Sequence, residues 1–212
     1  VRNLIASDGG MFNPTDRSAK ESNWANGGTL KDAVDCLVEN VRMVHVYGEG
    51  IGVTGTGNRL RNIQIHNCMS AALYLNNSGP VDIDGLLMFH DGRTHLRGGG
   101  PAGGLTFGAE DADKQEHRPA THGATVRRAV AIGCGPGLAF RSQRAGASFS
   151  DILIENSTFY ESREARGKQP VAVWFTPDAT YSEVVIRHSL FAQTVGKRTN
   201  LKQPPVDINS NA

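Results

Sequence analysis

Long hydrophobic runs are missing from this sequence. Nowhere do about 18 apolar residues follow one another, so no membrane-spanning helix is predicted. No basic segment followed by an apolar core opens the chain, so no secretory signal peptide is recognised. The sequence begins without methionine and inside a repeat. We therefore interpret residues 1–212 as one domain that is a segment of a longer protein, with a processed mature form as the alternative.

Cysteine is also scarce. The sequence contains three cysteines, Cys36, Cys68 and Cys134, and this odd number does not fit a disulfide framework. Cys68 and Cys134 hold equivalent repeat positions, and we expect both to be small buried residues. No spacing of cysteine and histidine resembles a zinc site. The sequence therefore gives no metal-ligating residue with certainty.

An excess of charge of one sign is absent as well. Lysine and arginine number 22 and the acidic residues 21, which leaves a net charge of +1. Binding to nucleic acid requires a clustered basic surface, so this class of partner is not predicted. Charged residues make up only 20% of the chain and glycines number 25, a composition that favours turns over helices. One segment, residues 29–37, could form a short capping helix or a distorted strand.

The chain does contain a repeated hexapeptide. Its first, fourth and sixth positions are apolar and its third position is Asn, Asp, Gly, Glu or Arg; the copies start at Val1, Val38, Leu60, Ile83, Val126, Phe149 and Tyr181. The starts differ by 37, 22, 23, 43, 23 and 32 positions. About 22 residues are enough for one coil of a parallel β-solenoid, and a longer spacing is one coil plus a loop. The pattern therefore predicts an all-β chain of stacked parallel strands.

A second short strand lies between the copies of the hexapeptide. These strands start at Ile51, Leu73, Leu105, Leu138, Val173 and Val206. Because side chains alternate along a strand, the first and third residues of each should face the core. The second and the fourth residues of these strands should form two outward columns. These columns include Tyr74, Asn76, Thr106, Arg141, Trp174 and Thr176.

Three polar, glycine-rich loops interrupt the repeats, at residues 8–28, 91–104 and 108–124. Long loops in a compact fold are often functional. The second and third loops flank the strand Leu105–Phe107 on either side. We therefore expect them to form the two walls of a cleft over the outward columns.

This outward face has the residue types that suit a carbohydrate. Flat aromatic rings match the apolar faces of sugars, and short polar groups match their hydroxyls, so the predicted substrate-binding residues are Tyr74, Asn76, Thr106, Trp174 and Thr176. An ordinary solvated sheet face is the alternative interpretation. The predicted catalytic residues are Asp91, His95, Arg97, Glu110, His117 and Arg141.

Two reactions fit these candidate catalytic residues. Carboxylates on opposite walls could act as acid and base in glycoside hydrolysis, about 5–9.5 Å apart. Alternatively, Arg or His could serve as the base for β-elimination from a uronic acid, with a cation or an Arg neutralising the carboxylate. The run Glu110-Asp111-Ala112-Asp113 could supply oxygen ligands to Ca²⁺. For each residue alone, a solvated loop charge is the simpler interpretation.

These features resemble the right-handed parallel β-helix, pectate-lyase-like superfamily, over nearly the whole chain. The resemblance is carried by the seven hexapeptides, by the polar turn residues Asn67 and Asn156, and by the glycine-led strands that begin at Gly50 and Gly104. The superfamily includes polysaccharide lyases, glycoside hydrolases, alginate epimerases and phage tailspikes. The resemblance implies an all-β, right-handed parallel β-helix of about seven coils, a fold that does not by itself fix function.

Two hypotheses about function follow. In the first, the protein is an extracellular or cell-surface enzyme, a lyase or a hydrolase, that cleaves or modifies a polysaccharide in the cleft. In the second, it is a non-catalytic glycan-binding or structural segment of a tailspike, adhesin or cell-surface protein, and a tailspike would imply a homotrimer.

Overall fold

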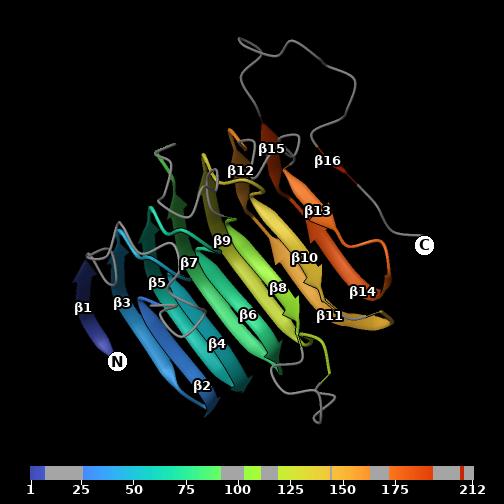
Figure 1. Ribbon diagram of the computed structural model, residues 1–212, viewed down its shortest axis with the longest axis horizontal. Coiled ribbons are helices and arrows are strands. Elements are labelled where there is room, and N and C mark those ends of the chain that lie inside the picture. The colour runs from blue at the N-terminus through green and yellow to red at the C-terminus, as the bar shows by residue number, and fades with distance from the viewer. Residues whose placement is uncertain are drawn as a thin grey trace, which may run out of the picture.

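A computed structural model describes residues 1–7, 26–91, 103–110, 119–143, 145–162, 172–192 and 206–207. Within these ranges the chain is all-β, and its strands form two parallel sheets (Figure 1). Since the described residues contain no helix, none of their segments is a candidate for a helical membrane span. Within the segment 29–37, which could have been a helix or a distorted strand, residues 29–34 belong to the strand β2 (Gly28–Val34).

Sheet A has nine strands, seven of which follow one another in the order β1-β3-β5-β7-β9-β11-β14. Two short strands extend it at one end, where β12 pairs with β9 and with β15. The strands of sheet A are β1 (Arg2–Ser7), β3 (Leu37–Val44), β5 (Asn58–His66), β7 (Val81–Phe89), β9 (Ala124–Ile132), β11 (Ala147–Glu155), β12 (Thr158–Tyr160), β14 (Ala179–Arg187) and β15 (Leu190–Ala192).

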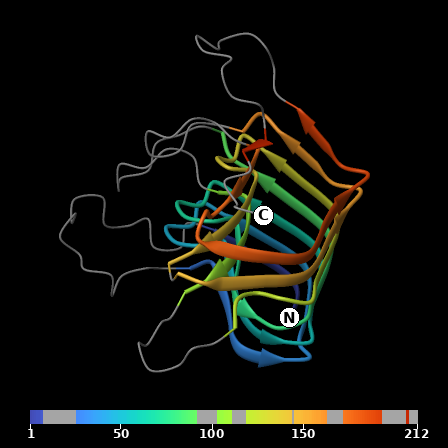
Figure 2. The ribbon, with the colours of Figure 1, turned by 90° about the vertical axis from the view of Figure 1, so that its right-hand side faces the viewer.

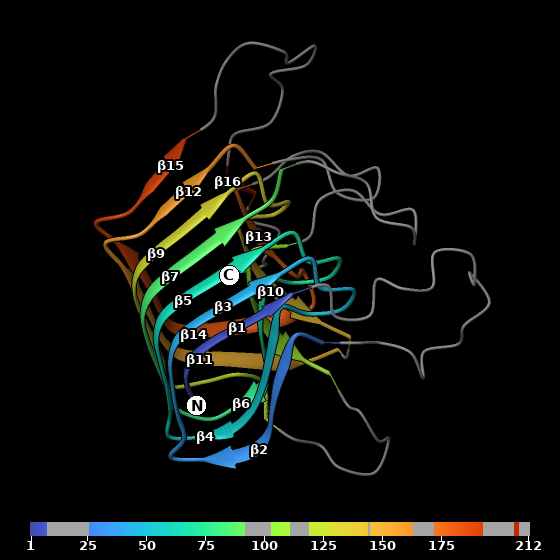
Figure 3. The same ribbon diagram turned by 90° about the vertical axis from the view of Figure 1, so that its left-hand side faces the viewer.

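Sheet B has seven strands in the order β16-β13-β10-β8-β6-β4-β2. Besides β2, they are β4 (Ile51–Thr56), β6 (Leu73–Ser78), β8 (Leu105–Ala109), β10 (Leu138–Ser142), β13 (Val173–Phe175) and β16 (Val206–Asp207). From β2 to β9 the chain alternates between the sheets, and each passage adds one strand to each stack (Figure 2 and Figure 3). This arrangement is compatible with a β-solenoid.

The third position of the hexapeptide has a backbone conformation that explains its composition. In all seven copies this residue has a positive φ, between 51° and 77°; the residues are Asn3, Asn40, Asn62, Gly85, Arg128, Asp151 and Glu183. Residues with a side chain rarely adopt this left-handed backbone region, and Gly, Asn and Asp tolerate it best. The strand can therefore bend at this position and continue, with apolar side chains facing the core on both sides of the bend.

The register of the second repeat is confirmed over its whole length. Successive starts pair in the order Ile51, Leu73, Leu105, Leu138, Val173 and Val206. A further strand, β2, extends this column, because Gly28 pairs with Ile51. The sequence pattern does not identify β2, because the other strands have apolar residues at their first and third positions, whereas the first position of β2 is a glycine.

The expected register between the hexapeptides at Val126 and Phe149 is wrong, whereas the expected offset of 32 between Phe149 and Tyr181 is confirmed. Val126 pairs with Ile154 and not with Phe149, and Ala131 likewise pairs with Phe159, so the offset is 28 residues instead of 23. The physical reason is that left-handed residues recur every five positions, and a shift of five superposes one such residue on another. The two matching sets are Gly123, Arg128 and Gly133 on one side and Asp151, Asn156 and Glu161 on the other.

The core lies between the inner faces of the two sheets. The expected inward residues of β4, β6, β8 and β10 are each at most 3% exposed. Phe140 is fully buried and stacks on Phe107 and Phe175, with ring centroids 5.0 and 4.8 Å apart. Cys68 and Cys134 are buried free thiols, as predicted. Stacking of equivalent side chains from successive strands thus fills the interior.

Candidate functional site

The candidate site lies on the outer face of sheet B. The predicted column is confirmed by pairing, since Tyr74 on β6 is next to Thr106 on β8, followed by Ala139 on β10 and Trp174 on β13. Neighbouring strands are about 4.8 Å apart. Residues 100 positions apart in the chain are therefore separated by only three strand spacings, roughly 14 Å.

Tyr74 is not the exposed flat ring that the sequence suggested. Its side chain is buried, and it lies against the backbone of Gly108, two residues further along the neighbouring strand from Thr106. A Cβ atom at Gly108 would be 2.7 Å from Cε2 and Oη of the tyrosine. The absence of a side chain at Gly108 therefore makes room for the ring, which leans along the strand direction.

The hydroxyl group of Tyr74 is in an unusual environment. It is buried and makes no hydrogen bond of ordinary geometry to any described residue. Burial raises the pKa of the phenol, and the nearby carboxylate of Glu110 raises it further. The carboxylate of Glu49 acts in the same direction, whereas the Arg141 guanidinium lowers this pKa. Tyr74 is consequently protonated at neutral pH and is a weaker acid than a phenol in water.

Glu110 is at the centre of a polar cluster where β6, β8 and β10 end. Its backbone N–H donates to the side-chain oxygens of Asn77 at 2.8 Å and Asn76 at 3.2 Å. Its carboxylate accepts a hydrogen bond of 2.7 Å from Nε2 of Gln143 and lies 3.8 Å from Nε of Arg141. The side chains of Glu110 and Arg141 are 22% and 40% exposed. A carboxylate, a guanidinium and an amide are thus brought together within reach of solvent.

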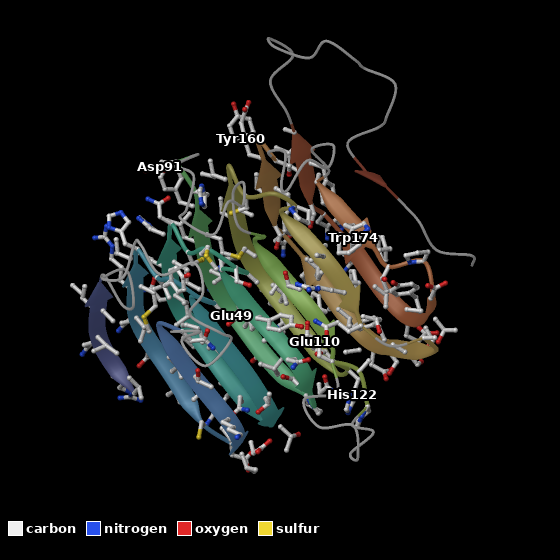
Figure 4. The ribbon with its side chains drawn as sticks, viewed as in Figure 1. Glu49, Asp91, Glu110, His122, Tyr160 and Trp174 are labelled. Carbon is white, nitrogen blue, oxygen red and sulfur yellow. The ribbon has the colours of Figure 1, made fainter. Side chains whose placement is uncertain are left out.

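The remaining predicted binding residues differ in accessibility. Thr106 and Thr176 are buried, and the backbone of Thr176 bonds to Phe140 and to the Tyr181 hydroxyl. Trp174 is partly exposed, on the same face as Glu110 (Figure 4). Among the predicted binding residues, the accessible part therefore consists of Trp174 and Asn76.

Asp91 lies away from this cluster. It follows β7 of sheet A, and Figure 4 shows it far from Glu110. Its backbone N–H donates to Oδ1 of Asn67 at 2.9 Å, and its carboxylate accepts a bond of 3.1 Å from the same amide. The structure thus does not bring Asp91 and Glu110 together, and the bonds of Asp91 fix the turn after its strand.

Other predictions fall on residues outside the described ranges. They include His95, Arg97 and His117, most of both cleft walls, and the Asp111 and Asp113 of the Ca²⁺ hypothesis. Within the described ranges, no three His, Cys, Asp or Glu side chains come together as a metal site would require. The cleft and the Ca²⁺ site remain predictions.

Two residues of the cluster were missed by the sequence reasoning. Gln143 follows Arg141 by two positions, so the alternation that predicted one could have predicted the other. Glu49 precedes β4 between two glycines and carries no such signal. It is buried, its carboxylate accepts a 3.1 Å hydrogen bond from the Ser70 hydroxyl, and Figure 4 shows it on the same face as Glu110. Two carboxylates therefore lie near the Tyr74 hydroxyl.

Comparison of the chain with protein-family models, with curated proteins and with solved structures finds no match in any of the three. The pectate-lyase-like resemblance therefore rests on the repeats alone.

Proposed function

We propose that this protein is a right-handed parallel β-helix of about seven coils, of the pectate-lyase-like type, that binds an extracellular polysaccharide along the outer face of sheet B. The parallel pairing of strands in two sheets supports the fold, because the second repeat is in register from β4 to β16. A regular row of strands presents equivalent positions at equal intervals, which suits a repeating linear ligand.

The observation that carries the binding proposal is a group of accessible side chains on the outer face of sheet B: Arg141 on β10 and Trp174 on β13, with Glu110 directly after β8 and Gln143 directly after β10. These side chains offer hydrogen-bond donors and acceptors next to an aromatic face. Arg141 and Glu110 lie 3.8 Å apart and partly exposed, so each can still bond to a hydroxyl or a carboxylate of a sugar. The Asn77 side chain accepts a hydrogen bond from the backbone N–H of Glu110, and the buried Tyr74 ring lies beside it, so both fix the position of Glu110.

Cleavage of the bound polysaccharide is the second candidate function, and the grouping of Glu110 with Arg141 favours it. A hydrolase needs two carboxylates about 5–9.5 Å apart. Asp91 does not provide the second one, whereas Glu49 and Glu110 both act on the same phenol. In an elimination, Arg141 would neutralise a uronate carboxylate, the Glu110 carboxylate would remove the proton on the adjacent carbon, and the double bond would form as the leaving oxygen departs and takes a proton from water.

The binding proposal is tested by titrating the protein with a panel of neutral and acidic polysaccharides. The variants are Trp174→Ala and Arg141→Gln, with Arg128→Gln on sheet A as the matched control. We expect one or more polysaccharides to bind, and each site variant to weaken binding about tenfold, equivalent to about 1.4 kcal/mol. Absence of binding to every polysaccharide, or equal affinity of the site and control variants, would contradict the proposal.

Turnover is measured separately on the polysaccharides that bind. Unsaturated products report a lyase and new reducing ends report a hydrolase. Glu110→Gln should abolish either signal while the circular dichroism spectrum is unchanged. Binding without any product would leave the non-catalytic glycan-binding segment as the function, and light scattering would then show whether the protein is the trimer expected of a tailspike.

A further inference from the structure

The outer face of sheet A carries a row of charges that alternate in sign from strand to strand. Cross-strand pairing aligns the four central ones, which are Arg61 on β5, Asp84 on β7, Arg127 on β9 and Glu155 on β11. The alternation continues by one strand on either side, to Glu39 on β3 and Arg187 on β14. Opposite charges on adjacent strands stabilise a sheet. Within one molecule, the row therefore holds neighbouring strands together, and the Arg127 side chain lies 3.0 Å from the Glu155 carboxylate.

An apolar group lies on the same face, near the ends of the two central strands. It consists of Leu87 and Phe89 on β7 and of Val130 and Ile132 on β9, and all four side chains are partly exposed. Leu87 pairs with Val130, and Phe89 pairs with Ile132. Stabilisation of the sheet by charge pairs gives no reason for these residues to be apolar. A contiguous apolar group on an outer face is typical of an interaction surface.

The face is large and lies outside both described sheets. Every described strand belongs to sheet A or sheet B, and the two views along the stack show no described strand outside sheet A (Figure 2 and Figure 3). From β3 to β14 the sheet has six strands, and all but β3 are nine residues long. At about 3.3 Å per residue and about 4.8 Å per strand, this face measures roughly 850 Å². A stable interface takes about 800 Å² from each partner.

We propose that the outer face of sheet A is a docking site for a second copy of this chain, and that the two copies pack face to face about a twofold axis. The axis runs parallel to the strands, between β7 and β9, so that β7 of each copy lies across from β9 of the other. Leu87 then faces Val130 of the second copy, and Phe89 faces Ile132 of the second copy. The symmetry makes each of these contacts twice.

The alternation of charge selects the position of the axis. An axis between two strands exchanges strands that are an odd number of steps apart, so every charge in the row meets the opposite sign. Asp84 faces Arg127 of the second copy, and Arg61 faces Glu155 of the second copy. An axis along a strand exchanges strands that are an even number of steps apart. It would place Arg61 against Arg127 of the second copy, and such like-charge contacts are unfavourable.

The order of side chains along the strands selects the direction of the axis. In β7 the apolar residues follow Asp84 by three and five positions, and in β9 they follow Arg127 by the same numbers. An axis parallel to the strands keeps these levels, so charges meet charges and apolar side chains meet apolar side chains. An axis across the strands would reverse the levels and place Asp84 against Phe89, where its charge would be buried without a partner. A second copy thus matches the face in sign, level and spacing at once.

The same geometry brings compatible residues together beyond the two central strands. The row of Phe89 and Ile132 continues to His66 on β5 and to Tyr160 on β12. Across the proposed axis, His66 faces Tyr160 of the second copy, and Tyr160 is 39% exposed. The contact leaves the outer face of sheet B uncovered, so this inference does not rest on the proposed binding of a polysaccharide.

Sedimentation velocity of the intact chain over a range of concentrations measures the association. We expect a dimer that dissociates on dilution. Val130→Lys should raise its dissociation constant about a hundredfold, because a twofold interface contains the substitution twice, at about tenfold each. Val130→Thr keeps the shape and the β propensity of the residue, and it should raise the constant about tenfold. Val34→Lys is the matched control, since Val34 is a 61% exposed valine on β2 of sheet B, and this variant should dimerise as the unmodified protein does.

An exchange of charges tests the position of the axis. Asp84→Arg and Arg127→Glu each place like charges across the interface, so each variant alone should be mainly monomeric. In an equal mixture, position 84 of either variant faces an opposite charge at position 127 of the other, and heterodimers should form. Circular dichroism and urea unfolding show that each variant is folded before it is mixed.

Four results would each overturn the proposal. The first is a protein that stays monomeric at millimolar concentration, and the second is a trimer. The third is a Val34→Lys protein whose dimer is weakened as much as that of Val130→Lys. The fourth is a mixture of the two charge variants that associates no more than either variant alone.

Discussion

Replacing Gly108 by alanine would place a methyl group where the Tyr74 ring now lies. The new Cβ would be 2.7 Å from Cε2 and Oη of the ring and 2.8 Å from Cζ. Carbon atoms in contact normally lie about 3.5–4.0 Å apart, so the ring would have to move by about 1 Å. Since Tyr74 is only 9% exposed, no open space receives it. Overpacking of this kind costs about 1–3 kcal/mol, and the free energy of unfolding should fall by that amount.

The displaced ring also reports on the candidate site. Moving the hydroxyl out of its buried position near Glu110 should lower the pKa of Tyr74 towards its ordinary value of 10.0. Urea unfolding measures the stability, and ultraviolet absorbance during an alkaline titration measures the tyrosine pKa. Gly52→Ala is the matched control on the same face, because its Cβ would meet only the side-chain amide of Asn26, at 3.3 Å.

Two outcomes would refute this reasoning about the packing of Tyr74. One is a Gly108→Ala protein that unfolds at the same urea concentration as the unmodified protein. The other is an unchanged tyrosine titration, which would mean that the ring is not held between Gly108 and Glu110. If Gly52→Ala destabilises as much as Gly108→Ala, the effect belongs to the whole sheet face and not to this contact.

Three further predictions follow from the core and from sheet A. Phe140→Ala should lower the free energy of unfolding by about 3–5 kcal/mol, because the ring is fully buried in a stack. Phe191→Ala removes a partly buried ring and should lower it clearly less. Equal losses in urea unfolding would contradict the stacking. Hydrogen bonds from its two flanking arginines lower the pKa of Glu155 in the folded protein, so its stabilising effect is complete above its ordinary pKa of 4.5 and is lost as the pH falls through the lower folded value. The melting temperature of Glu155→Gln should therefore lie below that of the unmodified protein at pH 7 and converge with it in acid; a constant difference would refute the ion pairs. Burial raises the pKa of the Cys68 thiol to about 12, so a thiol reagent should modify the less buried Cys36 first in the native protein, and mass spectrometry of the labelled peptides would show the order.

The candidate site was only partly predictable. The outward column of Tyr74, Thr106 and Trp174 follows from strand alternation, and pairing confirms that these residues are neighbours. Alternation does not say how far a side chain is covered, and the contact that buries Tyr74 depends on a glycine two positions along the next strand. The grouping of Glu110 with Gln143 and Glu49 depends on which strands end beside one another, and nothing local in the sequence records that.

By itself, the sequence determined the strands of the two repeats, apart from β2, and the faces they bury, and the third position of each hexapeptide carries a residue type consistent with the bend. Those properties depend on side-chain alternation and on the few residue types that tolerate a positive φ, and both are local. The tertiary structure alone decided which bend of β11 lies beside a given bend of β9. Because left-handed residues recur every five positions, the segment around Phe149 can align its bends with those of the Val126 strand in two registers, five residues apart. Only the pairing of complete strands, with Ile154 beside Val126 and Glu155 beside Arg127, selected one of them.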